Sequence, residues 1–359
     1  MNNPNLRMCR KIHPVGQGAM YSESFYEGDT LKQVVLYDCG SSSGMEKLNG
    51  EIDSLERVDH LFISHFHSDH VNGVERLIQK KGLKKIHIPF VTPQQFMLDF
   101  LTNSFEAGAG SDSVRFMGRA LQFLAYPRDR RQDGDSQVEF YVSNVLKNRY
   151  VILEDDPIHE RYWCYEVFKS SCETPGADKV INKVLGVLGV ALESAVDKYQ
   201  SQEWYDGLAA ALSDERKYSE AKGVFDKEFR NKHNSYSMIV YSHGICCYHW
   251  RRRCPSCDQF DCIYTGDAVL SKDMETARKI SNISPAYIQV PHHGSIDNHV
   301  PWIYHRCQVA FISAGDKNRY NHPGIGTIND IVNTCRETHI VSESTPAYEV
   351  SEEICTCRC

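Results

Sequence analysis

Short apolar runs separated by polar or glycine-containing turns dominate both ends of the chain. The runs have the length and apolar content of buried strands and lie at 33–37, 61–63, 84–89, 238–241, 262–264, 286–290 and 309–313. Residues 8–26 predict a strand, a tight glycine turn and a second strand. Helical patterns lie between the strands, at 74–81 and 275–281. This alternation predicts an α/β protein.

The middle of the chain has a different pattern. Residues 92–232 carry longer helical patterns at 93–105, 179–199 and 203–229, and apolar residues recur at three- and four-residue spacing between 180 and 192. We interpret 92–232 as a mostly helical insertion that covers or partners the site. It separates two halves of one fold, at 8–91 and 233–330. The second half contains a Cys-rich hairpin at 246–262, and a Cys-rich tail follows at 331–359.

Polar residues follow several of the predicted strands. Asp38 comes after the strand at 33–37, Asp267 after 262–264, the pair His292 and His293 after 286–290, and His322 in the segment after 309–313. The carboxyl ends of parallel strands meet at one edge of a sheet, where the sites of such proteins collect. We therefore expect these side chains to converge.

The segment at 64–70, Ser-His-Phe-His-Ser-Asp-His, is the strongest chemical signal. It holds three imidazoles and a carboxylate, from His65, His67, Asp69 and His70. That density exceeds what ordinary packing needs and matches the ligands of zinc and similar metals. Residues two apart in a tight loop can converge on one ion, and the next pair can turn toward a second. A His-rich surface loop is the alternative.

Composition limits the classes of function. The chain has 359 residues, of which 41% are hydrophobic and 24% charged, and a formal net charge of −7. This balance is typical of a globular protein, and it argues against a broad electrostatic grip on nucleic acid while allowing a local basic groove. No apolar run approaches the roughly 18 residues of a membrane helix, and the start lacks a signal-peptide core. We expect a cytoplasmic protein without a membrane partner.

Four motifs together resemble the metallo-β-lactamase superfamily. They are SHFHSDHVNG at 64–73, TGD at 265–267, VPHHGS at 290–295 and SAGDKNRYNHP at 313–323. In order and context they are similar to the hydrolase domain of the DNA-uptake protein ComEC. The resemblance covers about 10–90 and 233–325. It implies an αββα sandwich, with two packed sheets and outer helices, and a site for two divalent ions, zinc or manganese, at one edge.

The resemblance assigns metal ligands residue by residue. His65 and His67 would hold the first ion, Asp69 and His70 the second, and Asp267 would bridge the two.

Further residues carry over from the later motifs. The loop after 286–290 supplies another ligand, for which His293 is favoured and His292 is almost as suitable. His322 matches a terminal His-Pro motif and can bind metal or protonate the leaving group. Asp69, His293 and His322 are therefore the catalytic candidates. Asp38 would orient the His-rich loop at 64–70, called the metal loop below, without binding the ions itself. Capping of the turn that follows its strand is an equal alternative role for Asp38.

One superfamily ligand has no clear counterpart in this sequence. Many members place another histidine between the first motif and the bridging aspartate. The residues available are His87, His159, His233, His243 and His249. None has a convincing context, and His87 alternates with apolar neighbours as a structural histidine would. The first ion therefore has three protein ligands or borrows His292.

The site predicts a metal-dependent hydrolase, most simply a nuclease or phosphodiesterase that uses a metal-activated water. Its substrate would be a nucleic acid or nucleotide, with Lys317, Arg319 and Ser295 as rim contacts for phosphate. Ordinary solvated surface is an equal alternative for the two cations. One alternative is a hydrolase of a small ester, lactone or amide. Another is a binding or regulatory module of a multi-protein system, such as a defence system, with protein partners encoded alongside.

Fourteen cysteines in a cytoplasmic chain favour thiols and metal ligands over disulfides. One group predicts an additional structural zinc and comprises Cys247, His249, Cys254, Cys257 and Cys262. Free thiols in a polar hairpin are the alternative. The last residues include three alternating cysteines, which with Cys335 could form a second metal site or a reactive end.

Overall fold

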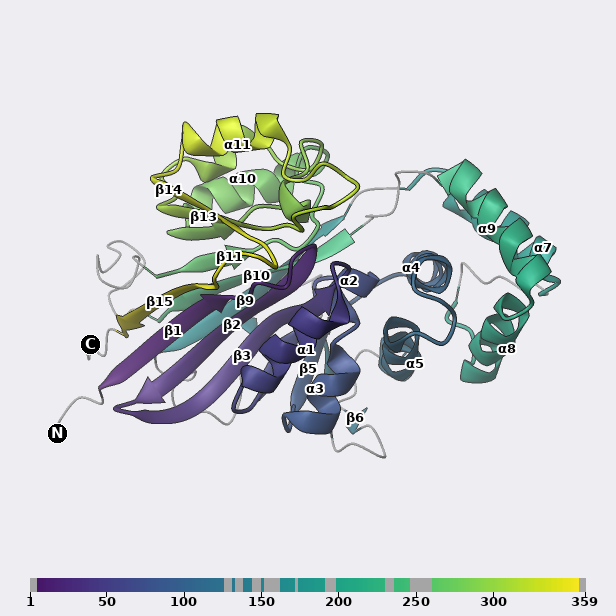
Figure 1. The fold of residues 1–359 in the computed structure, drawn as a ribbon, viewed down its shortest axis with the longest axis horizontal. Coiled ribbons are helices and arrows are strands. Elements are labelled where there is room, and N and C mark those ends of the chain that lie inside the picture. Colours follow the sequence, from purple (N-terminus) through teal and green to yellow (C-terminus); the bar gives the residue numbers. More distant parts are fainter. Residues whose placement is uncertain are drawn as a thin grey trace.

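Two β-sheets packed face to face form the centre of the protein (Figure 1). The computed structural model describes residues 5–125, 131–132, 138–143, 150–151, 162–171, 174–190, 198–229, 236–245 and 260–354. In the described part of the chain, no helix combines the length and apolar character that crossing a membrane requires.

The first sheet is built mainly from the N-terminal quarter of the chain. Its order is β15-β1-β2-β3-β4-β5-β7-β6, with β3, β4, β5 and β7 parallel and the other pairs antiparallel. The bounds are β1 Leu6–Ile12, β2 Gly18–Glu27, β3 Thr30–Ser41, β4 His60–Phe62, β5 Lys85–Pro89, β6 Arg131–Gln132, β7 Glu139–Ser143 and β15 Tyr348–Glu353. The strands predicted at 33–37, 61–63 and 84–89 are confirmed as β3, β4 and β5.

The second sheet comes mainly from the C-terminal third. Its order is β14-β13-β12-β11-β10-β9-β8, with β11 to β14 parallel. The bounds are β8 Tyr150–Val151, β9 Trp163–Ser171, β10 Tyr236–Gly244, β11 Cys262–Tyr264, β12 Tyr287–Gln289, β13 Val309–Ser313 and β14 Glu337–Val341. The four strands predicted between 238 and 313 correspond to β10, β11, β12 and β13.

Apolar side chains fill the space between the sheets and beneath the outer helices. The inter-sheet core includes Phe25, Phe62, Tyr165, Met238 and Phe311, all at most 1% exposed. Helices α1 (Met45–Ser54) and α3 (Val74–Lys80) cover the first sheet, and α10 (Met274–Ile283) and α11 (Ile325–Val332) cover the second (Figure 1). The predicted αββα sandwich is therefore confirmed.

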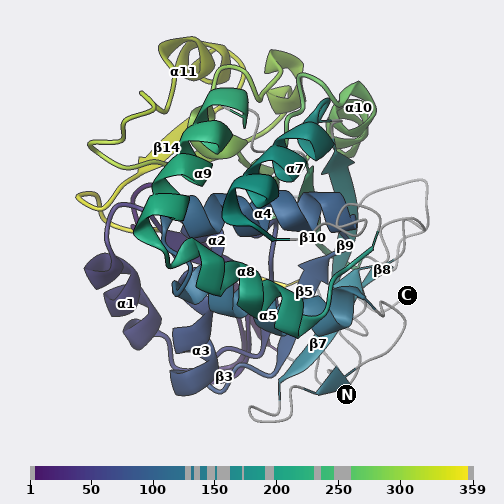
Figure 2. The ribbon, with the colours of Figure 1, turned by 90° about the vertical axis from the view of Figure 1, so that its right-hand side faces the viewer.

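The helices of the predicted insertion stack at one end of the sandwich. Their bounds are α4 Pro93–Glu106, α5 Asp112–Leu124, α7 Ala177–Leu188, α8 Gln202–Leu212 and α9 Glu215–Phe229. Figure 2 looks onto this end and shows α7, α8 and α9 in front of α4 and α5. Figure 1 shows that α4 and α5 lie between this outer group and the sheets. The short helix α2 (Ser68–Val71), which carries part of the metal-loop motif, lies beside α4 in both views.

Local chemistry explains where the helix predictions fail. The helix predicted at 203–229 is two helices, because the Asp214 carboxylate accepts hydrogen bonds from the backbone N–H groups of Arg216 and Lys217, each at 3.0 Å, and starts α9 anew. The helix predicted at 179–199 ends at Leu188, followed by Gly189 in the left-handed conformation (φ 70°). Residues 191–197 lie outside the described part.

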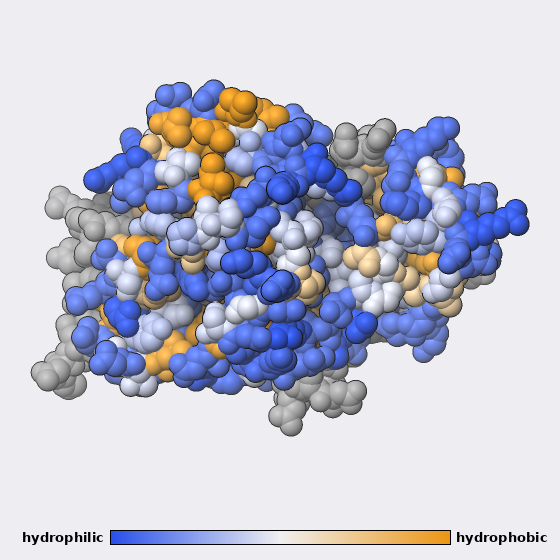
Figure 3. Space-filling view, in the orientation of Figure 1, coloured by the Kyte–Doolittle hydropathy of each residue, from blue (hydrophilic) through white to orange (hydrophobic). Residues whose placement is uncertain are grey.

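Strands in unexpected places complete both sheets. β7 and β9 lie inside the range assigned to the helical insertion, and β7 extends the first sheet while β9 extends the second. β14 and β15 lie in the range assigned to a Cys-rich tail. β15 pairs with β1 in register from Arg7 opposite Glu353 to Ile12 opposite Tyr348. On the surface, apolar side chains gather over α11, where Ile325 and Val332 are exposed (Figure 3).

A buried ion pair of the first sheet is hydrogen-bonded to the second sheet. Arg10 on β1 contacts Glu23 on β2 at 2.8 Å, and both side chains are at most 2% exposed. Glu23 also accepts hydrogen bonds from Tyr165, Ser242 and Tyr264 of the second sheet, at 2.6, 2.7 and 2.9 Å. The carboxylate thus satisfies donors from both layers, as a buried charge requires.

We expect Glu23→Ala to lower the free energy of unfolding by about 3–5 kcal/mol, because the buried Arg10 guanidinium would lose its counter-charge. Urea denaturation measures the loss. Asp53→Ala is the control, since it breaks the ion pair with Arg76 on the exposed surface, and it should leave the midpoint nearly unchanged. Equal midpoints for the two variants would contradict this role for Glu23.

Candidate metal centre

The ends of four strands bring the predicted site residues together. Asp38 lies in β3, His65 follows β4, Asp267 follows β11 and His293 follows β12. The backbone of Gly266 lies directly against two serine side chains: a Cβ added to Gly266 would lie 2.4 Å from Ser237 Oγ and 2.6 Å from Ser64 Cβ. Only glycine fits there, and its φ of 55° also favours glycine. The two sheets therefore meet at the site.

Asp38 holds the metal loop from behind. Its Oδ1 accepts a hydrogen bond from the Ser64 backbone N–H at 2.7 Å, and its Oδ2 accepts one from Ser64 Oγ at 2.7 Å. The same oxygen lies 2.8 Å from His70 Nδ1. Asp38 is fully buried, and it adopts a left-handed φ of 56°. A carboxylate that bonds the outer nitrogen of a histidine fixes the ring and raises its strength as a ligand.

Two more histidines are fixed in the same way. His65 Nδ1 lies 2.9 Å from Ser64 Oγ, and His293 Nδ1 lies 2.8 Å from the carbonyl oxygen of Ser313. The Nδ1 atoms of three rings are thus engaged by the protein. Their Nε2 atoms face inward, toward the carboxylates of Asp69 and Asp267.

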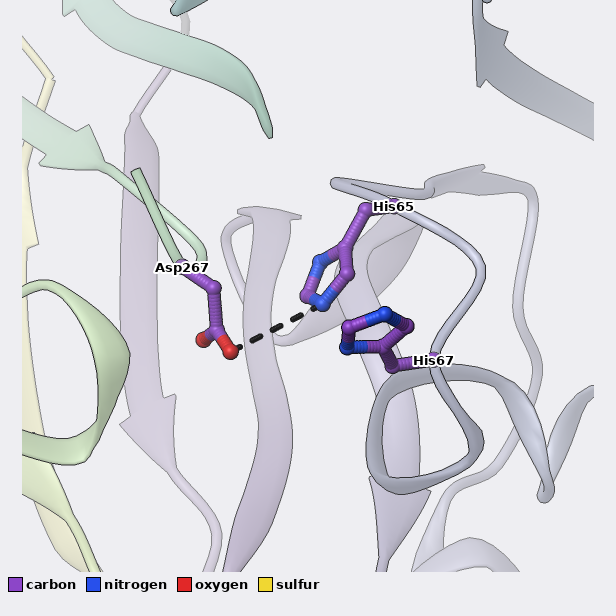
Figure 4. A group of neighbouring side chains, drawn as sticks. All are labelled: His65, His67 and Asp267. Atoms are coloured by element: carbon purple, nitrogen blue, oxygen red, sulfur yellow. Dashed lines mark ion pairs between the residues drawn. The ribbon is translucent and has the colours of Figure 1, made fainter. Parts of the chain in front are cut away.

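Two groups of donor atoms surround the Asp267 carboxylate. Within each group all donor atoms lie within 4.8 Å of one another; one group is His65, His67 and Asp267, and the other is Asp69, His70 and His293. Figure 4 shows the first group. Asp267 Oδ2 lies 3.7 Å from His65 Nε2, while its Oδ1 lies 3.2 Å from His70 Nε2. One oxygen therefore faces each group, as a bridging carboxylate requires.

The buried donor atoms fit divalent cations. Among the described residues, the Nε2 atoms of His65, His70 and His293 are buried without a hydrogen-bond partner. Buried polar atoms are seldom left unsatisfied, and imidazole with carboxylate is a ligand set for zinc or manganese. His65 is also held neutral, as a ligand must be, because burial and the neighbouring His70 lower its pKa well below the usual value.

The carboxylates dominate the electrostatics around His70. Burial opposes its protonation, but Asp267, Asp38 and Asp69 raise its pKa well above the ordinary value. Burial likewise opposes ionisation of Asp267, yet His292 and His70 lower its pKa well below the usual range. Carboxylates that favour positive charge on a neighbouring imidazole would equally favour a divalent cation.

His292 and His322 stand beside the donor groups. His292 Nε2 lies 3.6 Å from Asp267 Oδ2, and the His292 ring is 5.4 Å from that of His322. Burial lowers the pKa of His322 to about 4. His292 and His293 both take left-handed φ values, of 49° and 54°. Such strain, of order 1–3 kcal/mol per residue, persists at functional sites where the surroundings enforce it.

Other candidates lie away from the centre. His87 bonds His60 through a 3.1 Å contact and stacks on Phe62, and His243 contacts Glu166 at 3.2 Å. The other candidates for the missing histidine ligand, at 159, 233 and 249, lie outside the described residues. Four of the five residues of the predicted structural zinc site and the three cysteines of the tail also lie outside the described residues. The fifth zinc-site residue, Cys262, packs in the inter-sheet core. The structural zinc stays a prediction.

Sequence reasoning missed Asp99 of α4. Its Oδ1 lies 3.5 Å from His67 Nε2, and its Oδ2 accepts a hydrogen bond from the Tyr236 hydroxyl. Burial opposes charge on His67, but Asp99 raises the pKa of the imidazole to about 9. A signal existed: Asp99 is a carboxylate within the apolar run 96–101. A charge in such a run needs a buried partner.

Residues 25–148 match the family model of the metallo-beta-lactamase superfamily. The chain has the metallo-β-lactamase fold, and the matched segment is similar to members of this superfamily.

Curated relatives match over shorter segments. The Anti-Pycsar protein Apyc1 of Bacillus phage 010DV004 is 30% identical over 112 residues, which are 29% of this chain and 42% of that protein. Ribonuclease Z of Methanocaldococcus jannaschii is 36% identical over 50 residues, 14% of this chain and 16% of that protein. The chain thus spans less than half the length of either relative.

Among solved structures, the metallo-beta-lactamase fold protein YhfI of Bacillus subtilis matches 96% of this chain and 100% of its own, with 11% identity and a TM-score of 0.43. None of these findings shows the narrower resemblance to ComEC, which stays a prediction.

We expect Zn²⁺ or Mn²⁺ to raise the thermal unfolding temperature, because an ion that binds only the folded chain stabilises it by about 2.7 kcal/mol at a hundred times its dissociation constant. A chelator should reverse the shift, and His70→Ala should reduce it. An unchanged melting temperature of the wild-type protein on addition of either metal would contradict a metal centre.

Proposed function

We propose that this chain is a two-metal hydrolase of phosphodiester bonds, a nuclease or phosphodiesterase. The observation that carries the proposal is the placement of Asp267, which presents one oxygen to each of the two donor groups. In this proposal His65 and His67 bind the first ion, and Asp69, His70 and His293 bind the second. His293 is preferred to His292 because only His293 belongs to a donor group in the described part of the chain.

Two bound divalent ions would supply a water of lowered pKa and positive charge for the phosphate oxygens. The surrounding residues provide the rest. Asp38, Ser64 and Ser313 fix the rings of His70, His65 and His293, so the donors need no rearrangement. Burial of most of these groups strengthens their electrostatic interactions.

His322 is the proposed proton donor. In hydrolysis, water adds to phosphorus, one ester P–O bond breaks, and the departing oxygen takes a proton. The His322 ring lies beside His292 at the edge of the donor groups, and its buried Nδ1 has no hydrogen-bond partner among the described residues. A pKa of about 4 in the substrate-free protein leaves the ring neutral near pH 7 and makes its protonated form a ready proton donor. A phosphate beside it would favour the protonated form.

The phosphodiester substrate rests on two supports. Lys317 and Arg319 lie on the loop that leads to His322, and both are exposed, where they can contact phosphate. One of the matched relatives is a ribonuclease by name. Hydrolysis of a small ester, lactone or amide would need neither cation.

The decisive experiment assays the purified protein with Mn²⁺ or Zn²⁺ against linear DNA, circular DNA, RNA, a cyclic nucleotide and bis-p-nitrophenyl phosphate, with a lactone and a p-nitrophenyl ester in parallel. We expect cleavage of at least one phosphodiester. Cleavage of the lactone or carboxylic ester alone would overturn the proposal and support the alternative hydrolase.

We expect Asp267→Asn to lower kcat by at least about a hundredfold with the fold intact, because it removes the shared charge at nearly constant volume. Asp29→Asn removes an exposed carboxylate from the turn between β2 and β3, away from the donor groups; it is the matched control and should keep full activity. Circular dichroism checks the fold of both. Full activity of Asp267→Asn would contradict the two-metal mechanism.

A further inference from the structure

The four histidines of the two donor groups are held from outside, but one is held differently. His65, His70 and His293 each engage the protein through Nδ1 and turn Nε2 inward. In His67 the order is reversed. Figure 4 shows that its Nδ1, the ring nitrogen next to the attachment of the side chain, faces Asp267. Its Nε2 lies 3.5 Å from Asp99 Oδ1, on the other side of the ring.

Asp99 is fixed where it can act on His67. Its side chain is 2% exposed, and the Tyr236 hydroxyl donates a hydrogen bond to its second oxygen. Tyr236 begins β10 of the second sheet, and its ring packs edge-on to His65, with 6.5 Å between centroids. The carboxylate therefore has one oxygen satisfied by the sandwich and the other turned toward the metal loop.

Helix α4 is bonded to the metal loop at a second point. Asn103, one turn after Asp99 on the same helix, donates a hydrogen bond from Nδ2 to the carbonyl oxygen of Phe66 at 2.7 Å. Phe66 stands between His65 and His67 in the chain. The same Nδ2 also lies 2.9 Å from the Asp99 carbonyl oxygen. These contacts fix α4 against the backbone of the loop, so the distance from Asp99 to His67 is set by the fold.

We infer that Asp99 is a positioning residue for the first metal ion, acting through His67 in a carboxylate–histidine–metal arrangement. The His67 Nε2–H would donate to Asp99, which leaves Nδ1 as the neutral ligand atom. Such outer carboxylates fix the tautomer and raise the basicity of the ligand, and their loss typically costs about 10–100-fold in metal affinity. The 3.5 Å separation is long for a hydrogen bond, and contacts of this kind commonly tighten when a site is loaded.

This role also addresses the missing ligand of the superfamily. The first donor group has two histidines and the shared Asp267, whereas His87 and His243 point elsewhere. An ion with so few protein ligands depends strongly on the quality of each. Asp99 lies outside that donor group, so it compensates by strengthening His67 rather than by binding the ion.

The test is metal binding, and it rests on the proposed two-metal centre but not on any substrate. We expect Asp99→Asn to weaken binding of one Zn²⁺ or Mn²⁺ per chain by about 10–100-fold and to leave the other unchanged. Chelator competition followed by elemental analysis measures both. Asp206→Asn, which removes an exposed carboxylate from α8, is the matched control and should bind as the wild type does.

Two outcomes would overturn the inference. One is wild-type affinity for both ions in Asp99→Asn, even if the metal-free variant melts at a lower temperature, because a purely structural role changes only stability. The other comes from the wild-type protein: nitrogen-15 NMR of labelled histidine in the Zn²⁺ form must show a protonated Nε2 for His67. His67→Gln identifies the resonance. A protonated Nδ1 there would exclude the arrangement, whatever the variant does.

The result is separable from the substrate question. If no phosphodiester is cleaved but Asp99→Asn loses one ion, the proposed function fails while the inference stands. If cleavage occurs and Asp99→Asn binds both ions normally, the proposed function stands while the inference about Asp99 fails. Tyr236→Phe adds a graded check: it removes one hydrogen bond to Asp99 but keeps the charge, so its effect on affinity should be smaller than that of Asp99→Asn.

Discussion

The contact between two β-sheets is the constraint on which the rest of this structure depends. Donor atoms from the first sheet, such as those of His65 and His70, must stand within ångströms of Asp267 and His293 from the second. No single layer contains the centre. Glu23, which accepts hydrogen bonds from both layers, and the glycine contact at Gly266 fix the separation of the sheets. A shift of one sheet relative to the other would therefore displace the donor atoms of the site.

Groups from several parts of the fold, including a helix outside the sheets, also position the donor atoms. An imidazole ligand has two nitrogens, and its metal-binding atom is defined only when the other nitrogen is occupied. The groups that face the other nitrogen come from three places: β3 for His70, the end of β13 for His293 and helix α4 for His67. The helical segment thus contacts one of the donor groups as well as covering one end of the sandwich.

Local sequence signals predicted much of the fold and most of the inward-facing side chains. The apolar runs located β3, β4, β5 and β10 to β13, because strands buried on both faces leave a clear hydrophobic signature. The metal loop was evident because its residue types have few other uses. Asp99 was missed because its meaning depends on His67, 32 positions away and brought near only by packing. β14 and β15 were missed because alternating or mixed polarity, as in Tyr348–Glu353, is a weak strand signal.

The pairing of β1 with β15 places almost the entire chain inside one closed loop. Ile12 and Tyr348 are neighbours in the first sheet although more than three hundred positions separate them. Closing a loop of that length is entropically costly and slow, so the edge of the first sheet forms late. Until a ribosome has released the residues of β15, β1 presents an open strand edge on which another chain could pair. During synthesis the unpaired edge of β1 is therefore exposed to aggregation.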